Sequence, residues 1–505
     1  MTVAAHAPTL TPEQRQSVWR TLRSPRLLRT EVLAGLVVAL ALIPEAIAFS
    51  LIAGVDPRLG LFASFTMAVT IAFLGGRPAM ISAATAATAL VIAPLVKSHG
   101  VDYFIAAVIL AGIFQIILGV LGVAKLMRFI PRSVMVGFVN ALAILIFTSQ
   151  LPELLGVPWL VYPLVAVGLV IIFLLPRITK VVPAPLVAIV VLTAAAVLFA
   201  INVPTVGGKG ELPESLPSLF LPNVPLNFET FQILAPFAAG MAVVGLMESL
   251  MTAKLVDDVT DTHSMKVRES WGQGVANVIS GFTGGMGGCA MVGQTMINVK
   301  ASGARTRIST FMAGVFVLIL VVSLGDIVSL IPMAALVAVM IFVSIATFDW
   351  HSIKLSTLKR MPKSETTVML ATVVLTVWTH NLAIGVIFGV IVAMVAFARR
   401  VAHFMSVERT IEEHFGETFA KYKVSGELFF ASSNDLYMQF EYAEDPDRIV
   451  IDLYDSHLWD ASTIAALDSI AAKYHSYGKE VEVEGLNTAS AAIRERLGGM
   501  LNGAH

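Results

Sequence analysis

The stretch GGRPAMISAATAATALV covers residues 75–91, and a stretch of the same character, GGMGGCAMVGQTMINVK, covers residues 284–300. Each opens with a Gly-Gly pair, continues with a short irregular or extended piece and ends in a run of small residues. Neither leaves room for the roughly 20 residues that a bilayer-spanning helix needs. Irregular backbone at membrane depth is tolerated only where protein or water satisfies its polar groups. The two stretches therefore predict a pair of half-helices inside a membrane protein.

The rest of the sequence indicates a polytopic membrane protein. The 505 residues are 56% hydrophobic and 14% charged, with a mean hydropathy of +0.81, whereas soluble domains carry about 25% charged residues. Arginines precede the first apolar run and no short run with a cleavage site follows, so we expect a basic segment on the cytoplasmic surface and not a signal peptide. The single cysteine, Cys289, excludes an intramolecular disulfide.

The apolar runs give fourteen candidate transmembrane segments. They lie near residues 32–54, 59–75, 84–96, 102–124, 133–150, 159–175, 184–203, 231–253, 270–283, 292–299, 308–324, 328–347, 366–379 and 382–398. If each segment crosses once from a cytoplasmic N-terminus, the inside segments hold 23 Lys and Arg residues and the outside loops hold 3. This positive-inside bias favours fourteen crossings of the inner membrane, with both chain ends in the cytoplasm.

Corresponding features divide the chain into two halves of seven segments. The half-helices lie in segments three and ten, and segments one and eight each contain a glutamate, Glu45 in LIPEAIAF and Glu248 in GLMESLMT. An odd number of crossings inverts the second half, and paired short segments in an inverted repeat indicate a transporter's central site. Half-helices that begin near Ala84 and Val292 would point their N-termini at each other and bind an anion. Close packing of glycine-rich elements is the alternative explanation.

Several side chains are candidates for this site. We expect Pro44 to kink the first helix. Burial and a nearby anion both favour a neutral carboxyl, so Glu45 is expected to take up a proton as the anion binds, unless it is permanently neutral. For Glu248, proton coupling and structural hydrogen bonding both stay open. Gln273 and Asn277, four residues apart, are expected to bridge helices. The substrate-binding candidates are Ser82, Ala84, Thr85, Gly293, Gln294, Thr295 and Phe49.

The C-terminal part has a different composition. Residues 406–505 carry 18 acidic and 8 basic residues, whereas the preceding part carries 17 acidic and 26 basic ones. The run RIVIDLYD (448–455) predicts a buried strand, Asp460 caps an expected helix over 460–479, and EVEVEGLN (480–487) predicts another strand. This alternation indicates a small α/β domain. The predicted domains are a cytoplasmic segment over 1–30, a transmembrane domain over 31–403 and a cytoplasmic domain over 404–505.

Four motifs carry a resemblance to a known family: IPEAIAFSLIAGVDPRLGLFASF (43–65), ESLMTAKLVDD (248–258), GQGVANVISGFTGGM (272–286) and NVKASGARTRIS (298–309). They resemble the sulfate permease family, which includes animal solute carrier family 26. The resemblance implies a core (segments 1–4 and 8–11), a gate (5–7 and 12–14), anion transport by movement of one against the other, and a possible homodimer. The tail resembles a STAS domain, in which Ser462 matches a phosphorylated position of anti-sigma-factor antagonists; a structural role is favoured here.

Two departures from the family pattern shape the functional hypothesis. Glu45 stands where members often have glutamine, which suggests protonation chemistry, and Gln294 stands where many have arginine, which weakens the case for chloride or bicarbonate exchange. The favoured hypothesis is proton-coupled symport of a C4-dicarboxylate such as fumarate. The alternatives are a sulfate or bicarbonate transporter or exchanger, an anion channel, and a membrane sensor that signals through the tail.

The expected partners are a small anion, protons and membrane lipid, and the STAS domain is expected to bind a partner that the sequence does not identify. Basic residues sit in short loops and not on one face, so no nucleic-acid partner is expected. No metal-ligand spacing and no catalytic motif occurs. We therefore expect no cofactor, no metal and no enzymatic activity.

Overall fold

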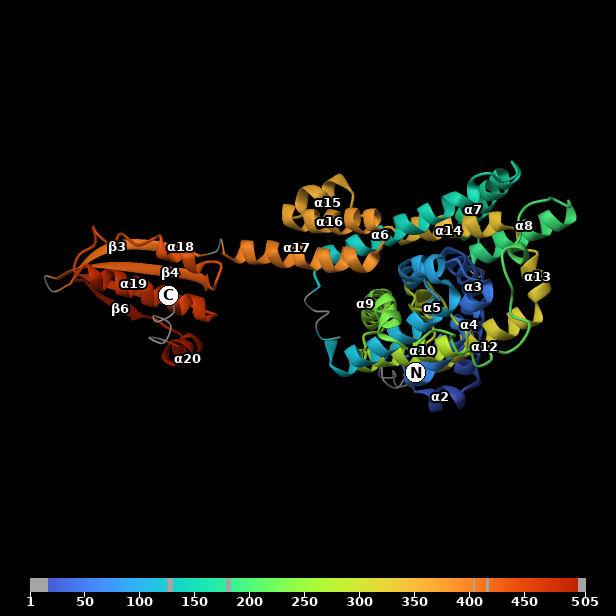
Figure 1. Ribbon diagram of the computed structural model, residues 1–505, viewed down its shortest axis with the longest axis horizontal. Helices are drawn as coiled ribbons and strands as arrows, with labels where there is room; N and C mark the ends of the chain where they lie inside the picture. The colour runs from blue at the N-terminus through green and yellow to red at the C-terminus, as the bar shows by residue number, and fades with distance from the viewer. Residues whose placement is uncertain are drawn as a thin grey trace, which may run out of the picture. The chain divides into compact units, whose positions relative to one another are not determined.

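The structure is a computed structural model, and it describes residues 17–123, 125, 130–178, 183–402, 405–414 and 417–497 (Figure 1). The chain divides into two compact units, residues 1–390 and residues 391–505. Helix α17 (Leu382–Ala402) crosses the division. Each unit is described by itself below.

The first unit is helical, and each of the fourteen predicted segments overlaps a helix, segments three and four both falling in α5. The helices are α2 (Val18–Leu22), α3 (Pro25–Ala53), α4 (Pro57–Leu74), α5 (Ala86–Val120), α6 (Arg132–Gln150), α7 (Val161–Ile178), α8 (Ala184–Leu198), α9 (Phe228–Thr260), α10 (Lys266–Phe282), α11 (Val292–Met296), α12 (Arg307–Ser323), α13 (Gly325–Ser329), α14 (Met333–Thr347), α15 (Leu355–Arg360) and α16 (Lys363–Thr379). Three short helical turns and two short strands complete it: η2 (Leu151–Leu154), η3 (Val206–Gly208), η4 (Ile297–Ala301), β1 (Ser82–Ala83) and β2 (Cys289–Ala290).

Seven helical stretches of the described chain are long and apolar enough to cross a membrane: Pro25–Ala53, Pro57–Leu74, Ala86–Val120, Arg132–Leu154, Val161–Ile178, Phe228–Thr260 and Leu382–Arg400. Three shorter apolar helices, α8, α12 and α14, accompany them. Helix α5 is interrupted at Gly100, whose φ of 84° and ψ of −177° are not helical. Glycine adopts this backbone without steric cost, and the interruption separates the predicted third and fourth segments.

Six helices pack as two interlocked sets. Helix α12 packs on α3 and α4 of the first half, and α5 packs on α9 and α10 of the second half. Glycines allow the close approach at both contacts, because a Cβ at Gly112 would lie 2.6 Å from the Gly274 carbonyl oxygen, and one at Gly314 would lie 3.0 Å from that of Phe65. The fourth segment of each half therefore packs on the first two segments of the other half, as an inverted repeat requires.

A second group of helices surrounds α14. This helix contacts α6, α7 and α8, while α16 packs on α6 and α7 packs on α8 (Figure 1). The two groups meet where α14 and α8 contact α3, and where α5 contacts α6. The helices around α14 correspond to the segments assigned to the gate. Movement of one group against the other stays a prediction.

The second unit contains a four-stranded sheet in the order β3-β4-β5-β6. Its strands and helices are β3 (Ser406–His414), β4 (Glu417–Leu428), α18 (Ser433–Tyr437), β5 (Arg448–Leu458), α19 (Ala461–Ser476), β6 (Glu480–Glu484) and α20 (Thr488–Leu497). Strands β3 and β4 are antiparallel, while β4, β5 and β6 run parallel. Asp460 caps α19 as predicted, accepting a hydrogen bond from the Thr463 N–H at 3.0 Å. Ser462 is exposed in the first turn of that helix.

Candidate anion site

The two glycine-rich stretches meet as a pair of antiparallel strands. Ser82 pairs with Ala290 and Ala83 pairs with Cys289. The pairing needs a glycine beside it, because a Cβ at Gly288 would lie 1.8 Å from the Ala83 carbonyl oxygen. The strands thus bring together the starts of two helices that lie some two hundred positions apart in the sequence.

Both helix starts leave backbone N–H groups without intrahelical partners. Thr85 precedes α5 in an extended conformation, and its hydroxyl accepts a hydrogen bond from the Thr88 N–H at 3.4 Å. Met291 precedes α11 in the same conformation without a side-chain cap. A Cβ at Gly293 would meet no atom within 4 Å, so open space lies in front of this helix. The predicted half-helix starts near Ala84 and Val292 are thus within two residues of those observed.

A cavity of about 680 Å³ lies at these two helix starts. Residues of α3, α5, α9 and α11 line it, and so do residues of α6 and α14 from the second helix group. Four charged residues contribute to its wall: Glu45, Glu248, Lys254 and Asp258. Lys254 and Asp258 are exposed, so the cavity is continuous with the surface at that end of α9.

The two glutamates have different neighbours. Glu45 of α3 lies beside the side chain of Gln294, in the first turn of α11. Glu248 of α9 accepts a hydrogen bond from the Cys289 thiol at 2.9 Å. The thiol in turn lies 3.1 Å from the Thr85 hydroxyl. Each carboxyl is therefore connected to the start of one of the two helices.

The cavity wall contains six of the residues predicted for the site: Glu45, Phe49, Thr85, Glu248, Gly293 and Gln294. Ser82, Ala84 and Thr295 are buried and are not among its lining residues. The Ser82 hydroxyl accepts a hydrogen bond from the Gln273 amide at 2.6 Å, and the Thr295 hydroxyl accepts one from the Ile81 N–H at 3.0 Å. Pro44 is buried within α3, and its kink stays a prediction.

The predicted helix-bridging role is confirmed for Asn277, whereas Gln273 connects α10 to the strand β1 and not to another helix. Gln273 connects α10 to Ser82, and the Asn277 amide donates to the Gln115 side chain of α5 at 2.8 Å. Asn277 also accepts a hydrogen bond from the Gly288 N–H at 2.8 Å. These amide hydrogen bonds fix the positions of the two glycine-rich stretches between the helices.

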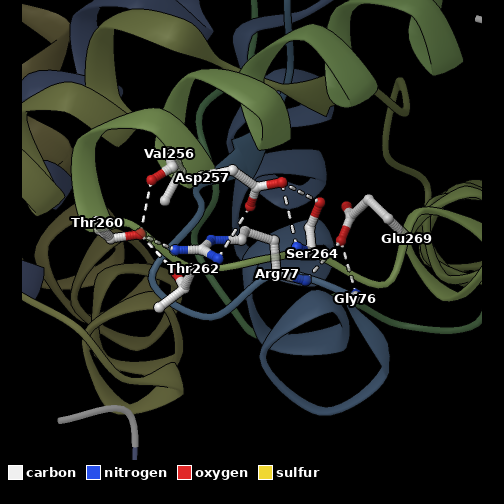
Figure 2. Close-up of polar contacts among 8 residues, drawn as sticks. All are labelled: Gly76, Arg77, Val256, Asp257, Thr260, Thr262, Ser264 and Glu269. Atoms are coloured by element: carbon white, nitrogen blue, oxygen red, sulfur yellow. Dashed lines mark hydrogen bonds and ion pairs between the residues drawn. The ribbon is translucent and has the colours of Figure 1, made fainter. Parts of the chain in front are cut away.

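A buried ion pair fixes the first glycine-rich stretch at its N-terminal end (Figure 2). The Arg77 side chain is 1% exposed, and its Nη1 lies 3.0 Å from Asp257 Oδ1 near the end of α9. Thr260 also accepts a hydrogen bond from the guanidinium group. The Glu269 carboxylate of α10 accepts hydrogen bonds from the Gly76 and Arg77 N–H groups at 2.7 and 3.1 Å. The loop before β1 is thereby tied to α9 and α10 of the second half.

Sequence reasoning did not assign Lys254, Asp258 or Cys289 to the site. One signal for the first two was available, because both follow Glu248 at helical spacing. The residues Glu248, Met251, Lys254, Leu255 and Asp258 all line the cavity. Cys289 gave no such signal. Its part in the site depends on the pairing of the two strands, which brings it beside Thr85.

Comparison with known proteins identifies the family. The sulfate permease family matches residues 28–372, and the STAS domain matches residues 410–499. The chain belongs to the sulfate permease family. It is 52% identical over 470 residues to the putative sulfate transporter YbaR of Bacillus subtilis, covering 93% of this chain and 97% of the relative. It is 25% identical over 523 residues to the bicarbonate transporter BicA of Picosynechococcus, covering 94% and 90%.

Solved structures support the same fold. The transmembrane domain of a cyanobacterial bicarbonate transporter BicA superposes with a TM-score of 0.64 at 26% identity, covering 71% of this chain and 98% of that one. The murine anion transporter Slc26a9 in its inward-facing state superposes with a TM-score of 0.80 at 15% identity, covering 100% and 93%, and shows the fold alone. The chain is an anion transporter of this family with a C-terminal STAS domain, as the sequence predicted.

Proposed function

We propose that this transporter moves a small inorganic oxyanion, sulfate before bicarbonate, and that Glu45 takes up a proton with it. The observation that carries the proposal is that two helix N-termini open on one cavity whose wall also contains a carboxyl group. Each helix start offers free N–H groups and about half a unit of positive charge. Together they favour an anion without a fixed cation between them.

The position of Glu45 couples proton uptake to anion binding. An ionised Glu45 would face the same cavity as the bound anion, and the two like charges would repel each other. Anion binding therefore favours the neutral carboxyl, and the Gln294 side chain can hydrogen-bond to either form of it. The proton and the anion would cross together with reduced net charge.

The names of the relatives favour an inorganic substrate. YbaR is named as a putative sulfate transporter and BicA as a bicarbonate transporter. The C4-dicarboxylate expected from the sequence thus ranks behind sulfate and bicarbonate. Glu45 and the half-helices do not by themselves separate these anions, because all of them are small and negatively charged.

A proteoliposome panel tests the proposal. Radiolabelled sulfate, bicarbonate, fumarate and chloride would be offered under imposed pH and sodium gradients. We expect sulfate to accumulate when the outside is more acidic than the lumen, and we expect a sodium gradient alone to have no effect. Preferred accumulation of fumarate would restore the dicarboxylate hypothesis. Anion conductance without any coupling would indicate a channel.

We also propose an inner-membrane location with both chain ends in the cytoplasm, a homodimer, and a regulatory STAS domain. The distribution of Lys and Arg supports the orientation. Protease digestion of inside-out and right-side-out vesicles checks it, since the STAS domain should be cut only in inside-out vesicles.

A further inference from the structure

We propose that Cys289 is a positioning residue that connects the protonation of Glu248 to the anion site at the start of α5. The inference rests on the proposed function, because it concerns how a proton and an anion favour each other's binding. Cys289 is buried in β2, between a carboxyl and a hydroxyl that both line the cavity.

The geometry is a chain of hydrogen bonds across three elements. It runs from Glu248 Oε2 in α9 to Cys289 Sγ in β2 at 2.9 Å, and from there to Thr85 Oγ1 at 3.1 Å. The β1–β2 pairing holds the Cys289 backbone opposite Ala83. The next residue is also fixed, because the Ala290 N–H donates to the Ser249 hydroxyl of α9 at 3.1 Å.

The direction of these hydrogen bonds depends on the charge of Glu248. An ionised carboxylate only accepts hydrogen bonds, so the Cys289 S–H points to Glu248 and the Thr85 hydroxyl donates to the sulfur. A neutral carboxyl can donate its proton to the sulfur. The S–H then points to the Thr85 oxygen. The Thr85 hydrogen, released from the sulfur, can then donate to an anion in the cavity in place of the Thr88 hydroxyl, which lies 3.0 Å away.

Proton uptake at Glu248 would therefore add one hydrogen-bond donor where the anion lies. The only proton gained comes from solvent, and the hydrogens of Cys289 and Thr85 stay on their own atoms and only reorient. A hydroxyl in place of the thiol can do the same, whereas a methyl group cannot. Anion affinity should accordingly rise as the pH falls, and this pH dependence should require a hydrogen-bonding side chain at position 289.

Other charged groups face the same cavity. They are Glu45 of α3 and the exposed Lys254 and Asp258 of α9. Glu45 would give a pH dependence of its own. The effect of Glu248 is therefore measured in the Glu45→Gln background. In that background Glu248 is the remaining carboxyl beside the helix starts.

The experiment compares Cys289→Ala with Cys289→Ser, each combined with Glu45→Gln. The Michaelis constant for sulfate is measured in exchange at pH 6 and pH 8, and sulfate binding is measured separately as an increase in melting temperature. In the parent, affinity should fall about fivefold or more over this range, an ordinary size for coupling between two sites. The serine variant should keep this change and the alanine variant should lose it.

Three results would overturn the inference. The first is an alanine variant that keeps the full pH dependence. The second is a loss of the pH dependence in both variants while the serine variant melts normally, because residue 289 would then act through packing alone. The third is a parent that binds sulfate equally at both pH values. A wild type that neither transports nor binds any anion of the panel would instead overturn the proposed function, and the coupling with it.

Discussion

Glu45 and Glu248 occupy equivalent places in the two halves, yet the groups that lie beside them differ. Glu45 meets an amide, Gln294, and Glu248 meets the thiol Cys289. An amide can both donate and accept, so it suits a carboxyl that gains and loses a proton facing the anion. A thiol transmits a change of hydrogen-bond direction. The two carboxyls should therefore contribute differently to transport.

Replacement of Glu45 tests the contribution of this carboxyl to proton coupling. The Glu45→Gln variant keeps the shape of the side chain but binds no proton, so sulfate accumulation driven by a pH gradient should fall to the level seen without one. Exchange of labelled for unlabelled sulfate should persist, because the helix starts are unchanged. Both are measured in proteoliposomes. Undiminished accumulation in this variant would exclude Glu45 as the proton-coupling residue.

Gly288, beside the strand pair, should not tolerate alanine. At Gly288 a Cβ would lie 1.8 Å from the Ala83 carbonyl oxygen. Gly288→Ala should separate β1 from β2, destabilise the protein by about 1–3 kcal/mol or more, and lower both its melting temperature and its transport. Gly208→Ala is the matched control, because a Cβ there would meet nothing within 4 Å. Equal melting temperatures of the two variants would contradict the close approach of the strands.

Gly293 lies instead at the open start of α11, where a Cβ would meet nothing within 4 Å. Gly293→Ala should melt like the wild type, since no neighbour has to move. Its methyl group would occupy space that we assign to the anion, so the Michaelis constant for sulfate should rise several-fold. Uptake kinetics over a range of sulfate concentrations check this. An unchanged constant would place the anion elsewhere in the cavity.

At the scale of elements, the loop before β1 depends on one buried ion pair. Removal of one partner of such a pair costs about 3–5 kcal/mol, because the other charge is left unpaired. Arg77→Met should therefore lower the melting temperature strongly, and the double variant Arg77→Met/Asp257→Asn should recover part of the loss. A double variant no more stable than the single one would mean that Asp257 is not the partner that matters.

The elements also show what could be read from the sequence. The half-helices were predictable because Gly-Gly pairs and missing length are local features. The direction of the Ser82 side chain was not predictable, because side chains alternate along a strand. Only the fold shows that Ser82 is hydrogen-bonded to Gln273 of α10. Strand β3 was missed for a similar reason, since SVERTIEEH is a charged edge strand without apolar alternation. Pairing across the halves, which places Cys289 beside Thr85, is a tertiary property.

At the scale of the whole molecule, the cavity is complete within the first unit. Its lining residues all lie between Ala41 and Thr347, whereas the STAS sheet begins at Ser406. The four-stranded sheet has its own core, in which Tyr422, Ile451 and Tyr474 are fully buried. Neither the anion site nor its hydrogen bonds therefore require the tail, and a regulatory domain can modulate flux without forming part of the path.

A chain that ends after Arg400 should consequently still transport. We expect sulfate accumulation with an unchanged Michaelis constant and an altered maximal rate, because the binding residues are kept and only regulation is lost. Full-length Asp445→Ala is the matched control. Asp445 accepts hydrogen bonds from Arg409 at 2.8 Å and Tyr422 at 2.7 Å in the STAS domain, so this variant disturbs the domain without removing it. If the truncated protein melts normally but carries no sulfate, the tail contributes directly to transport, and the self-contained site described above would be wrong.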